Sequence, residues 1–319
     1  MLIGVDASRA VLPNKRGVEY YGWYLLKELF ALDTKNRYRL YAPHLPTEDF
    51  GAFPNVEWKI LPARRLWSQY QLAKEVRLNP PDVLFVPSHV VPLFSNVPTV
   101  VTIHDLAYKY FPDAYTSFAR RYLDFSTGVS VGKAKRVIVP STATAHDVVK
   151  FYKADAKKIA VIPHGYDSKE YRPKASDEKP PIAGPYIFFI GRVEVRKNVT
   201  LLVDAFALLA KEIKNIQLVI AGKPGHGYEL VTKKIDALPE PIRQRIVMAG
   251  YLSTEDGAHY MRHAEAFVFP SLYEGFGLPV LEAMASNTPV IASSASCLPE
   301  VAGKAAILLP PQNALSWAA

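Results

Sequence analysis

Short apolar runs of strand length alternate with helical patterns along the whole chain of 319 residues. In the first half these runs are residues 2–6, 38–41, 56–60, 83–86, 99–103, 136–139 and 159–162. In the second half they are residues 186–190, 217–221, 246–249, 266–269 and 289–292. Alternation of this kind predicts an α/β fold built on parallel, doubly wound sheets.

A polar stretch separates the two series of strands. Residues 174–181 have no apolar period and end in Pro180-Pro181, which is typical of a linker or an exposed loop. We therefore expect a first domain over residues 1–170, a linker over residues 171–185 and a second domain over residues 186–319. The chain is long enough for two domains, each with its own core.

Composition narrows the possible partners and the compartment. The longest apolar runs are far shorter than the roughly 20 residues that span a bilayer, and the first residues lack the basic flank of a signal peptide. A single cysteine, Cys297, fits a reducing compartment, so we expect the cytoplasmic side. The net charge of +8 suits a polyphosphate ligand, an anionic membrane or nucleic acid, but no nucleic-acid motif is present.

Basic pairs and aromatic residues gather in the first half of the chain. A solvated surface explains each basic pair singly, whereas together with the aromatic residues they predict a face for peripheral contact with an anionic membrane. The residues of this expected face are Arg64, Arg65, Trp67, Tyr70, Tyr108, Lys109, Tyr110, Phe111, Arg120, Arg121, Tyr122, Lys157 and Lys158.

The most specific motif is Glu-Gly-Phe-Gly-Leu-Pro-Val-Leu-Glu at residues 274–282, shortly after the apolar run 266–269. We interpret it as strand, glycine-rich loop and helix, with Pro279 at the first helical position. Unpaired N–H groups at such a helix start suit a phosphate, and glycine lets the backbone approach it. The alternative is that Glu274 caps a loop and Glu282 is simply solvated.

The pattern of residues 274–282 resembles the signature of the retaining nucleotide-sugar glycosyltransferases of family 4 (group 1), which have the GT-B fold of two Rossmann-like domains facing a cleft. The resemblance implies that Glu274 lies against the donor sugar and that Glu282 accepts hydrogen bonds from the nucleotide ribose. It places the backbone of the intervening loop against the donor; these residues are Gly275, Phe276, Gly277 and Leu278.

A second motif follows the run 186–190, where the sequence reads Gly191-Arg192-Val193-Glu194-Val195-Arg196-Lys197. Arg192 offers a fork of donors and Lys197 a point charge, both suited to a diphosphate. The resembling family places such an Arg and Lys on the donor diphosphate and a backbone position like that of Leu252 near the base. These charges stabilise a departing nucleotide, so we expect no metal and no cofactor in the transfer.

In the first domain, His104 and Asp105 follow the run 99–103 and are expected at the carboxyl end of a strand. An isolated histidine there is ordinarily structural, but the resemblance implies that His104 contacts the donor sugar. Asp105 is a candidate either for orienting His104 or for binding the acceptor. Gly17 resembles the glycine of the family's first strand-to-helix loop, on the donor side. His164 stands where the family has asparagine, and we interpret it as structural.

The resemblance implies transfer of a hexose, with the anomeric configuration retained, from a nucleotide diphosphate sugar to a glycan or lipid-linked acceptor. Bacterial mannosyltransferases of surface-polysaccharide and lipopolysaccharide assembly are the nearest match, so GDP-mannose is the first donor to test. The alternatives are a nucleotide-sugar epimerase of the same fold and a non-catalytic sugar-nucleotide-binding protein. The sequence stops soon after Pro310-Pro311, and we expect the family's C-terminal helices to be missing.

Overall fold

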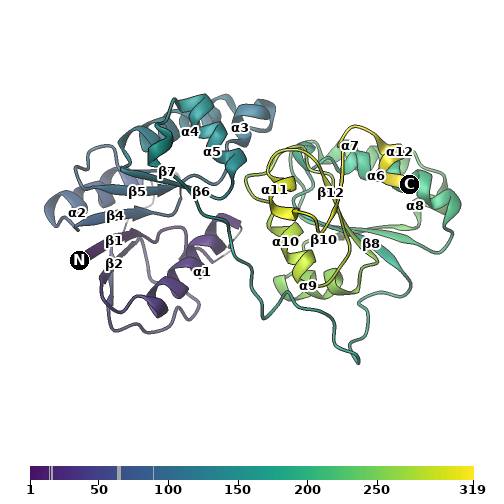
Figure 1. Cartoon of the computed structure of the whole chain (residues 1–319), viewed down its shortest axis with the longest axis horizontal. Coiled ribbons are helices and arrows are strands. Elements are labelled where there is room, and N and C mark those ends of the chain that lie inside the picture. Colours follow the sequence, from purple (N-terminus) through teal and green to yellow (C-terminus); the bar gives the residue numbers. More distant parts are fainter. Residues whose placement is uncertain (14, 16, 63–65, 89) are drawn as a thin grey trace. The chain divides into compact units, whose positions relative to one another are not determined.

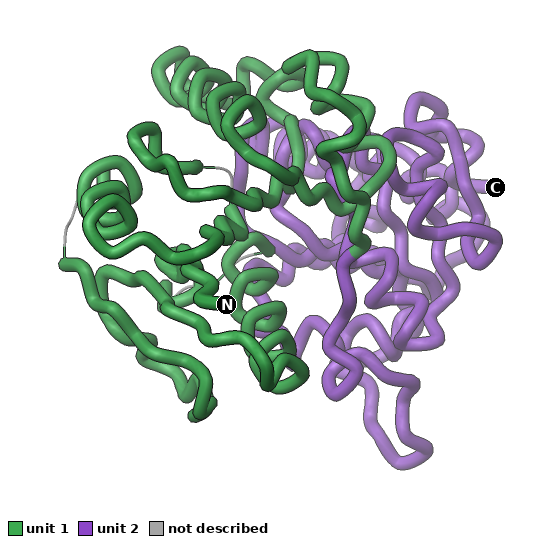
Figure 2. The backbone as a smooth tube through the Cα atoms, turned by 60° about the vertical axis from the view of Figure 1, so that its left-hand side comes forward, with its two compact units in different colours: residues 1–163 green, residues 164–319 purple. Residues whose placement is uncertain are grey.

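The computed structural model describes residues 1–13, 15, 17–62, 66–88 and 90–319. It forms two compact units, Met1–Pro163 and His164–Ala319 (Figure 2). Each unit is a parallel β-sheet with helices on both faces (Figure 1). The segment expected as a linker, residues 171–185, lies within the second unit.

The sheet of the first unit has the strand order β3-β2-β1-β4-β5-β6-β7, with every strand pair parallel. Its strands are β1 Leu2–Asp6, β2 Arg37–Ala42, β3 Val56–Ile60, β4 Val83–Val86, β5 Thr99–Thr102, β6 Arg136–Val139 and β7 Ile159–Val161. Its α-helices are α1 Gly17–Leu32, α2 Ala73–Leu78, α3 Ala107–Tyr110, α4 Ser117–Lys133 and α5 Thr142–Tyr152. A π-helical turn, Ser68–Leu72, precedes α2, and 3-10 turns occupy Pro112–Ala114 and Ala156–Lys158.

The sheet of the second unit has the order β10-β9-β8-β11-β12-β13 and is again parallel throughout. Its strands are β8 Tyr186–Ile190, β9 Gln217–Ala221, β10 Ile246–Gly250, β11 Ala266–Phe269, β12 Val290–Ser293 and β13 Ile307–Leu309. Its α-helices are α6 Val199–Glu212, α7 Tyr228–Asp236, α8 Glu240–Arg243, α9 Thr254–His263, α10 Leu278–Ala285, α11 Leu298–Ala302 and α12 Ala314–Ala318, and a 3-10 turn occupies Val195–Lys197.

The central strands of the second unit are buried on both faces, which is why their sequences are nearly continuous apolar runs. Phe188 and Phe189 on β8 pack with Phe267 and Phe269 on β11 in one core cluster. Strand order reverses between β8 and β11, and in open sheets of this kind ligands bind at the carboxyl ends of the strands beside that reversal. The core therefore fixes where the loops after β8 and β11 meet.

These sheets confirm the predicted α/β class with two doubly wound parallel sheets. All twelve predicted strands are present within a residue or so, and β13 Ile307–Leu309 was not predicted. Asparagine is a common N-cap residue, but the side chain of Asn198 before α6 donates to the carbonyl oxygens of Pro270 and Pro311 and does not cap the helix. Within the described ranges, no helix combines the length and apolarity needed to cross a membrane.

Candidate functional site

The loop from β11 to α10 carries the glutamate motif. Gly277 occupies the N-cap of α10 with φ of 92°, a conformation that favours glycine, and a Cβ there would lie 2.6 Å from the Leu298 side chain. Helix α10 begins at Leu278, so Pro279 is its second residue and not the first as expected. Strand, tight glycine turn and helix N-terminus are therefore arranged as an anion site requires.

Glu274 is buried in an ion-pair cluster with two basic side chains. Its Oε1 accepts a hydrogen bond from Lys197 Nζ at 2.5 Å, and its Oε2 accepts one from Arg196 at 2.9 Å. Arg196 also donates to the carbonyl oxygen of Tyr273 at 3.0 Å and to Glu194 at 2.9 Å. Lys197 lies 4.8 Å from the centre of the Phe269 ring, a cation–π contact. Ion pairs therefore connect the loop after β8 to the loop after β11.

The charges of this cluster support one another. Burial alone would raise the pKa of Glu274, but Lys197 and Arg196 hold it below its ordinary value. Burial lowers the pKa of Lys197, and the Glu274 carboxylate offsets part of that effect. Glu274 is therefore ionised. The charge of buried Lys197, in turn, depends on the nearby Glu274 carboxylate.

Arg192 lies at the same sheet edge but differs in exposure. Its side chain is 57% exposed, with Nε 3.4 Å from the carbonyl oxygen of Pro224 and 3.9 Å from a Glu194 oxygen. Gly191 directly follows β8, and at the neighbouring Gly222 a Cβ would lie 1.8 Å from the Gly191 carbonyl oxygen, so the loops after β8 and β9 touch through their backbones. The exposed side chain of Arg192 has room to turn toward an anion, whereas the Lys197 side chain is held by Glu274.

Glu282 on α10 faces Tyr171, whose phenol hydrogen-bonds to its carboxylate. Burial raises the pKa of Glu282 to about 7, and the Tyr171 hydrogen bond only partly opposes this shift. The carboxylate therefore changes charge close to neutral pH. It is not the solvated helix residue of the alternative interpretation.

The other residues expected to bind donor lie in loops of the same unit. Phe276 is buried and packs against the ring of His164, with ring centres 5.0 Å apart, and burial lowers the pKa of His164 to about 4. Leu252 follows β10 and packs partly against the core. Gly275 precedes Phe276 in the loop, and Leu278 is the first residue of α10. His164 is half-buried, and its structural role stays a prediction.

In the first unit, His104 follows β5 and is buried. Its Nε2 donates to the carbonyl oxygen of Pro87 at 2.8 Å, and the Tyr21 ring meets it edge-on with ring centres 4.7 Å apart. Asp105 accepts a hydrogen bond from the N–H of Ala107 at the start of α3. Gly17 begins α1 and a Cβ there would meet nothing within 4 Å, so packing does not require glycine at this position.

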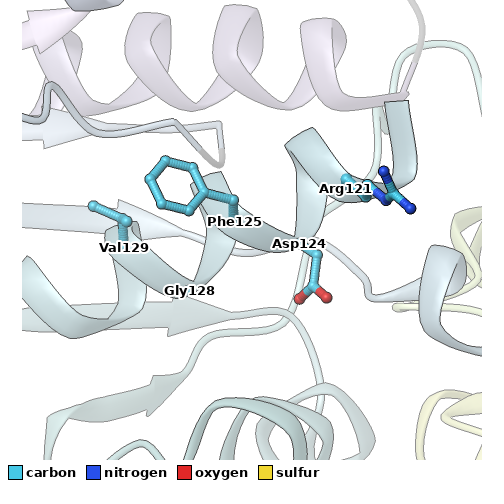
Figure 3. Close-up of a pocket in the computed structure, with 5 residues that line it drawn as sticks. All are labelled: Arg121, Asp124, Phe125, Gly128 and Val129. Carbon is cyan, nitrogen blue, oxygen red and sulfur yellow. The ribbon is translucent and has the colours of Figure 1, made fainter. Parts of the chain in front are cut away.

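The expected basic and aromatic face is only partly exposed. Tyr108 is buried, and Arg64 and Arg65 lie outside the described residues. Helix α4 instead presents a stripe at helical spacing, in which exposed Phe118, Arg121, Tyr122 and Phe125 are followed by half-buried Val129. We call these five residues the α4 stripe. Figure 3 shows Arg121, Phe125 and Val129 lining an open pocket with Asp124 and Gly128.

Sequence reasoning assigned no role to Arg196, Glu194 or Tyr171. The sequence could have indicated a role for Arg196 and Glu194, because both lie between Arg192 and Lys197 in the same motif. Tyr171 is distant from Glu282 in the chain, and no local pattern connects the two residues.

Two family models match the chain in succession. The model "Glycosyltransferase Family 4" matches residues 15–170, and the model "Glycosyl transferases group 1" matches residues 167–319. O-antigen chain mannosyltransferase B of Escherichia coli is 29% identical over 222 residues, which is 67% of this chain and 58% of that protein. O-antigen chain mannosyltransferase RfbU of Salmonella typhimurium is 27% identical over 72% of this chain and 61% of that protein. The chain thus spans about three fifths of these relatives.

Solved structures share the architecture. Sucrose-phosphate synthase from Thermosynechococcus elongatus superposes with a TM-score of 0.74 at 20% identity, covering 99% of this chain and 88% of that one. Anabaena HepE, solved in complex with UDP and glucose, gives a TM-score of 0.72 at 19% identity, covering 99% of this chain and 87% of that one. At these identities the likeness shows the fold.

Proposed function

Because the chain belongs to the group 1, family 4 glycosyltransferases and has their GT-B fold, we propose that it transfers a hexose from a nucleotide diphosphate sugar to a glycan or lipid-linked acceptor. The observation that carries the proposal is the Lys197–Glu274–Arg196 cluster beside the N-terminus of α10. The relatives named as O-antigen mannosyltransferases favour mannose, with GDP-mannose as donor.

We propose that Arg192 and Lys197 bind the diphosphate and stabilise the charge that grows on it as the sugar bond breaks. An ammonium group has three N–H donors, and the bond to Glu274 uses one of them. Lys197 is thus able to contact Glu274 and a phosphate together. This electrostatic stabilisation needs no metal ion at the diphosphate.

We propose that the configuration is retained by front-face attack, in which the leaving phosphate takes the acceptor proton. The alternative for retention is a carboxylate nucleophile, as in retaining glycosidases. Glu274 suits that role poorly, because two ion pairs stabilise its charge and lower its pKa. Its role in the proposal is to orient the donor sugar. The backbone from Gly275 to Leu278, Leu252 and Gly191 contact the rest of the donor.

For the first unit we propose that His104 contacts the sugar and Asp105 the acceptor, with Gly17 on the donor side. The His104–Pro87 hydrogen bond fixes the ring and places the proton on Nε2. The turn bond from Asp105 to Ala107 likewise fixes the carboxylate at the start of α3. Both side chains are therefore held in one orientation before any ligand binds.

We expect GDP and GDP-mannose to raise the melting temperature more than other nucleotide diphosphates and their sugars. A ligand at 100 times its dissociation constant adds roughly 2.7 kcal/mol to stability. Transfer from GDP-mannose, measured as GDP release with a mannolipid acceptor, is expected to be unchanged by EDTA. Loss of activity in EDTA contradicts the metal-free account, and conversion of the donor to an epimer without GDP release contradicts the transferase itself.

We also propose that the α4 stripe contacts an anionic membrane from the cytoplasmic side. Phe118 is 81% exposed and Phe125 62% exposed, and Arg121 lies between them. Aromatic rings beside a basic side chain suit the interface of an anionic bilayer. We expect Phe118→Ser/Phe125→Ser to weaken binding to phosphatidylglycerol vesicles at least about tenfold, since each ring buries apolar area there. Leu32→Ser, also exposed, is the control, and equal binding by both variants contradicts the proposal.

A further inference from the structure

Two histidines and a glutamate converge in the second unit, away from the β8 and β11 loops. His259 and His263 lie one turn apart on α9 with stacked rings, 4.8 Å between centres, and Glu178 approaches from the polar segment before β8. One ligand atom from each residue lies within 4.8 Å of the others. His259 Nδ1 and Glu178 Oε1 are 3.6 Å apart.

In each imidazole, one ring nitrogen lies within hydrogen-bond distance of a backbone carbonyl oxygen, and the other nitrogen faces a second oxygen atom. His259 Nε2 lies 2.8 Å from the carbonyl oxygen of Lys179, so this nitrogen is a donor and Nδ1 faces the Glu178 carboxylate. His263 Nδ1 lies 3.0 Å from the carbonyl oxygen of His259, and Nε2 lies 3.1 Å from the carbonyl oxygen of Glu178. A neutral imidazole has a single N–H donor, so the two neutral rings supply hydrogens for only two of these four nitrogen–oxygen contacts.

Two protons or one divalent cation supply the missing charge. Two charged imidazoles with ring centres 4.8 Å apart repel each other. A cation between the nitrogens and the carboxylate satisfies the same contacts without crowding two charged rings. A ring nitrogen bonded to a backbone carbonyl is also the usual orientation of a metal-binding histidine.

We propose that Glu178, His259 and His263 bind a divalent transition-metal ion of the zinc class. Ligand atoms about 2.1 Å from a tetrahedral ion lie roughly 3.4 Å apart. The His259 and Glu178 atoms are 3.6 Å apart, and because all three ligand atoms lie within 4.8 Å, small side-chain rotations bring in His263. Two imidazoles and a carboxylate are a known zinc ligand set.

The ion fastens the segment before β8 to helix α9. That segment is already attached to α9 by Arg262, which donates to the carbonyl oxygen of Glu170 at 2.8 Å. It also carries Tyr171, the hydrogen-bond partner of Glu282. The role is structural, so it is independent of the metal-free transfer proposed for the donor site.

The test is calorimetric titration of the EDTA-treated, desalted chain with Zn²⁺, followed by Co²⁺ absorption. We expect one ion per chain and at least about 100-fold weaker binding in His259→Gln and in His263→Gln, since each variant loses one of three ligands. His146→Gln, an exposed histidine on α5, is the matched control and is expected to bind like the unchanged chain. Circular dichroism without metal checks that each variant is folded.

Tryptic cleavage after Lys174, which is followed by Ala175, reports whether the segment is held against α9. Zn²⁺ is expected to slow this cleavage in the unchanged chain and in His146→Gln, but not in His259→Gln under the same conditions. Equal Zn²⁺ affinity in the α9 variants and the unchanged chain overturns the proposal. So does the absence of stoichiometric binding by the unchanged chain.

Discussion

Replacing Glu274 by glutamine is expected to lower the free energy of unfolding by about 3 kcal/mol and turnover at least about 100-fold. The stability loss follows because Lys197, buried beside Glu274, loses its carboxylate, and breaking one side of a buried ion pair costs about 3–5 kcal/mol. The turnover loss follows if the carboxylate orients the sugar for attack. Urea unfolding and GDP release from GDP-mannose measure the two effects.

Three further variants separate folding from catalysis at this cluster. Glu212→Gln, exposed at the end of α6, is the matched control and is expected to change neither quantity. Glu274→Gln/Lys197→Met removes both charges, so most of the lost stability is expected to return while turnover stays low. Arg192→Ala, half-exposed, is expected to lower turnover with little effect on unfolding. Full turnover in folded Glu274→Gln removes Glu274 from the reaction.

The sequence predicts the fold well because the physics of a buried parallel sheet is local. A strand covered on both faces must be apolar along its whole length, and runs such as residues 186–190 and 217–221 therefore show their bounds directly. The prediction omits β13, whose apolar run is followed at once by Pro310-Pro311. Contacts between distant segments are not visible in the sequence either: the amide of Asn198 donates to the carbonyl oxygens of Pro270 and Pro311.

The site is predicted in part for the same reason. Gly277 and the two glutamates sit in one local motif, whose turn geometry depends on neighbouring residues. Pairings between distant segments do not show in the sequence: Arg196 binds Glu274 across 78 positions, and Tyr171 reaches Glu282 from the segment expected as a linker. The His259–His263 spacing was visible, but its partner Glu178 was not.

Glu282→Gln is expected to raise stability at pH 8 by about 3 kcal/mol while weakening nucleotide binding. In the unfolded chain the carboxyl has its ordinary pKa of 4.5, whereas burial raises it to about 7 in the folded chain. Between these values the folded state holds the proton and the unfolded state does not, so stability falls as pH rises from 4.5 to 7 and the full penalty is present above 7. Glutamine has no such penalty, so urea unfolding should show a gain that vanishes toward pH 4.5.

The same charge explains the loss of binding. Ribose hydroxyls donate best to an ionised carboxylate, and hydrogen bonds to charged groups contribute about 1.5–3 kcal/mol, so GDP affinity at pH 8 is expected to fall roughly 10- to 100-fold in Glu282→Gln. Affinity of the unchanged chain should decline as pH falls through 7. Glu282→Gln, titrated calorimetrically in the same buffers, supplies the baseline for the phosphate's own titration.

Tyr171→Phe tests the link between the two effects. The phenol lowers the pKa of Glu282, so its removal is expected to move the midpoint of the affinity curve to higher pH while leaving the carboxylate in place. A buried but functionally silent Glu282 predicts the stability gain in Glu282→Gln with unchanged GDP affinity. A solvated Glu282 predicts neither effect. Glu282→Gln both stabilises the protein and weakens nucleotide binding only if the carboxylate is desolvated by the fold and hydrogen-bonded to the nucleotide.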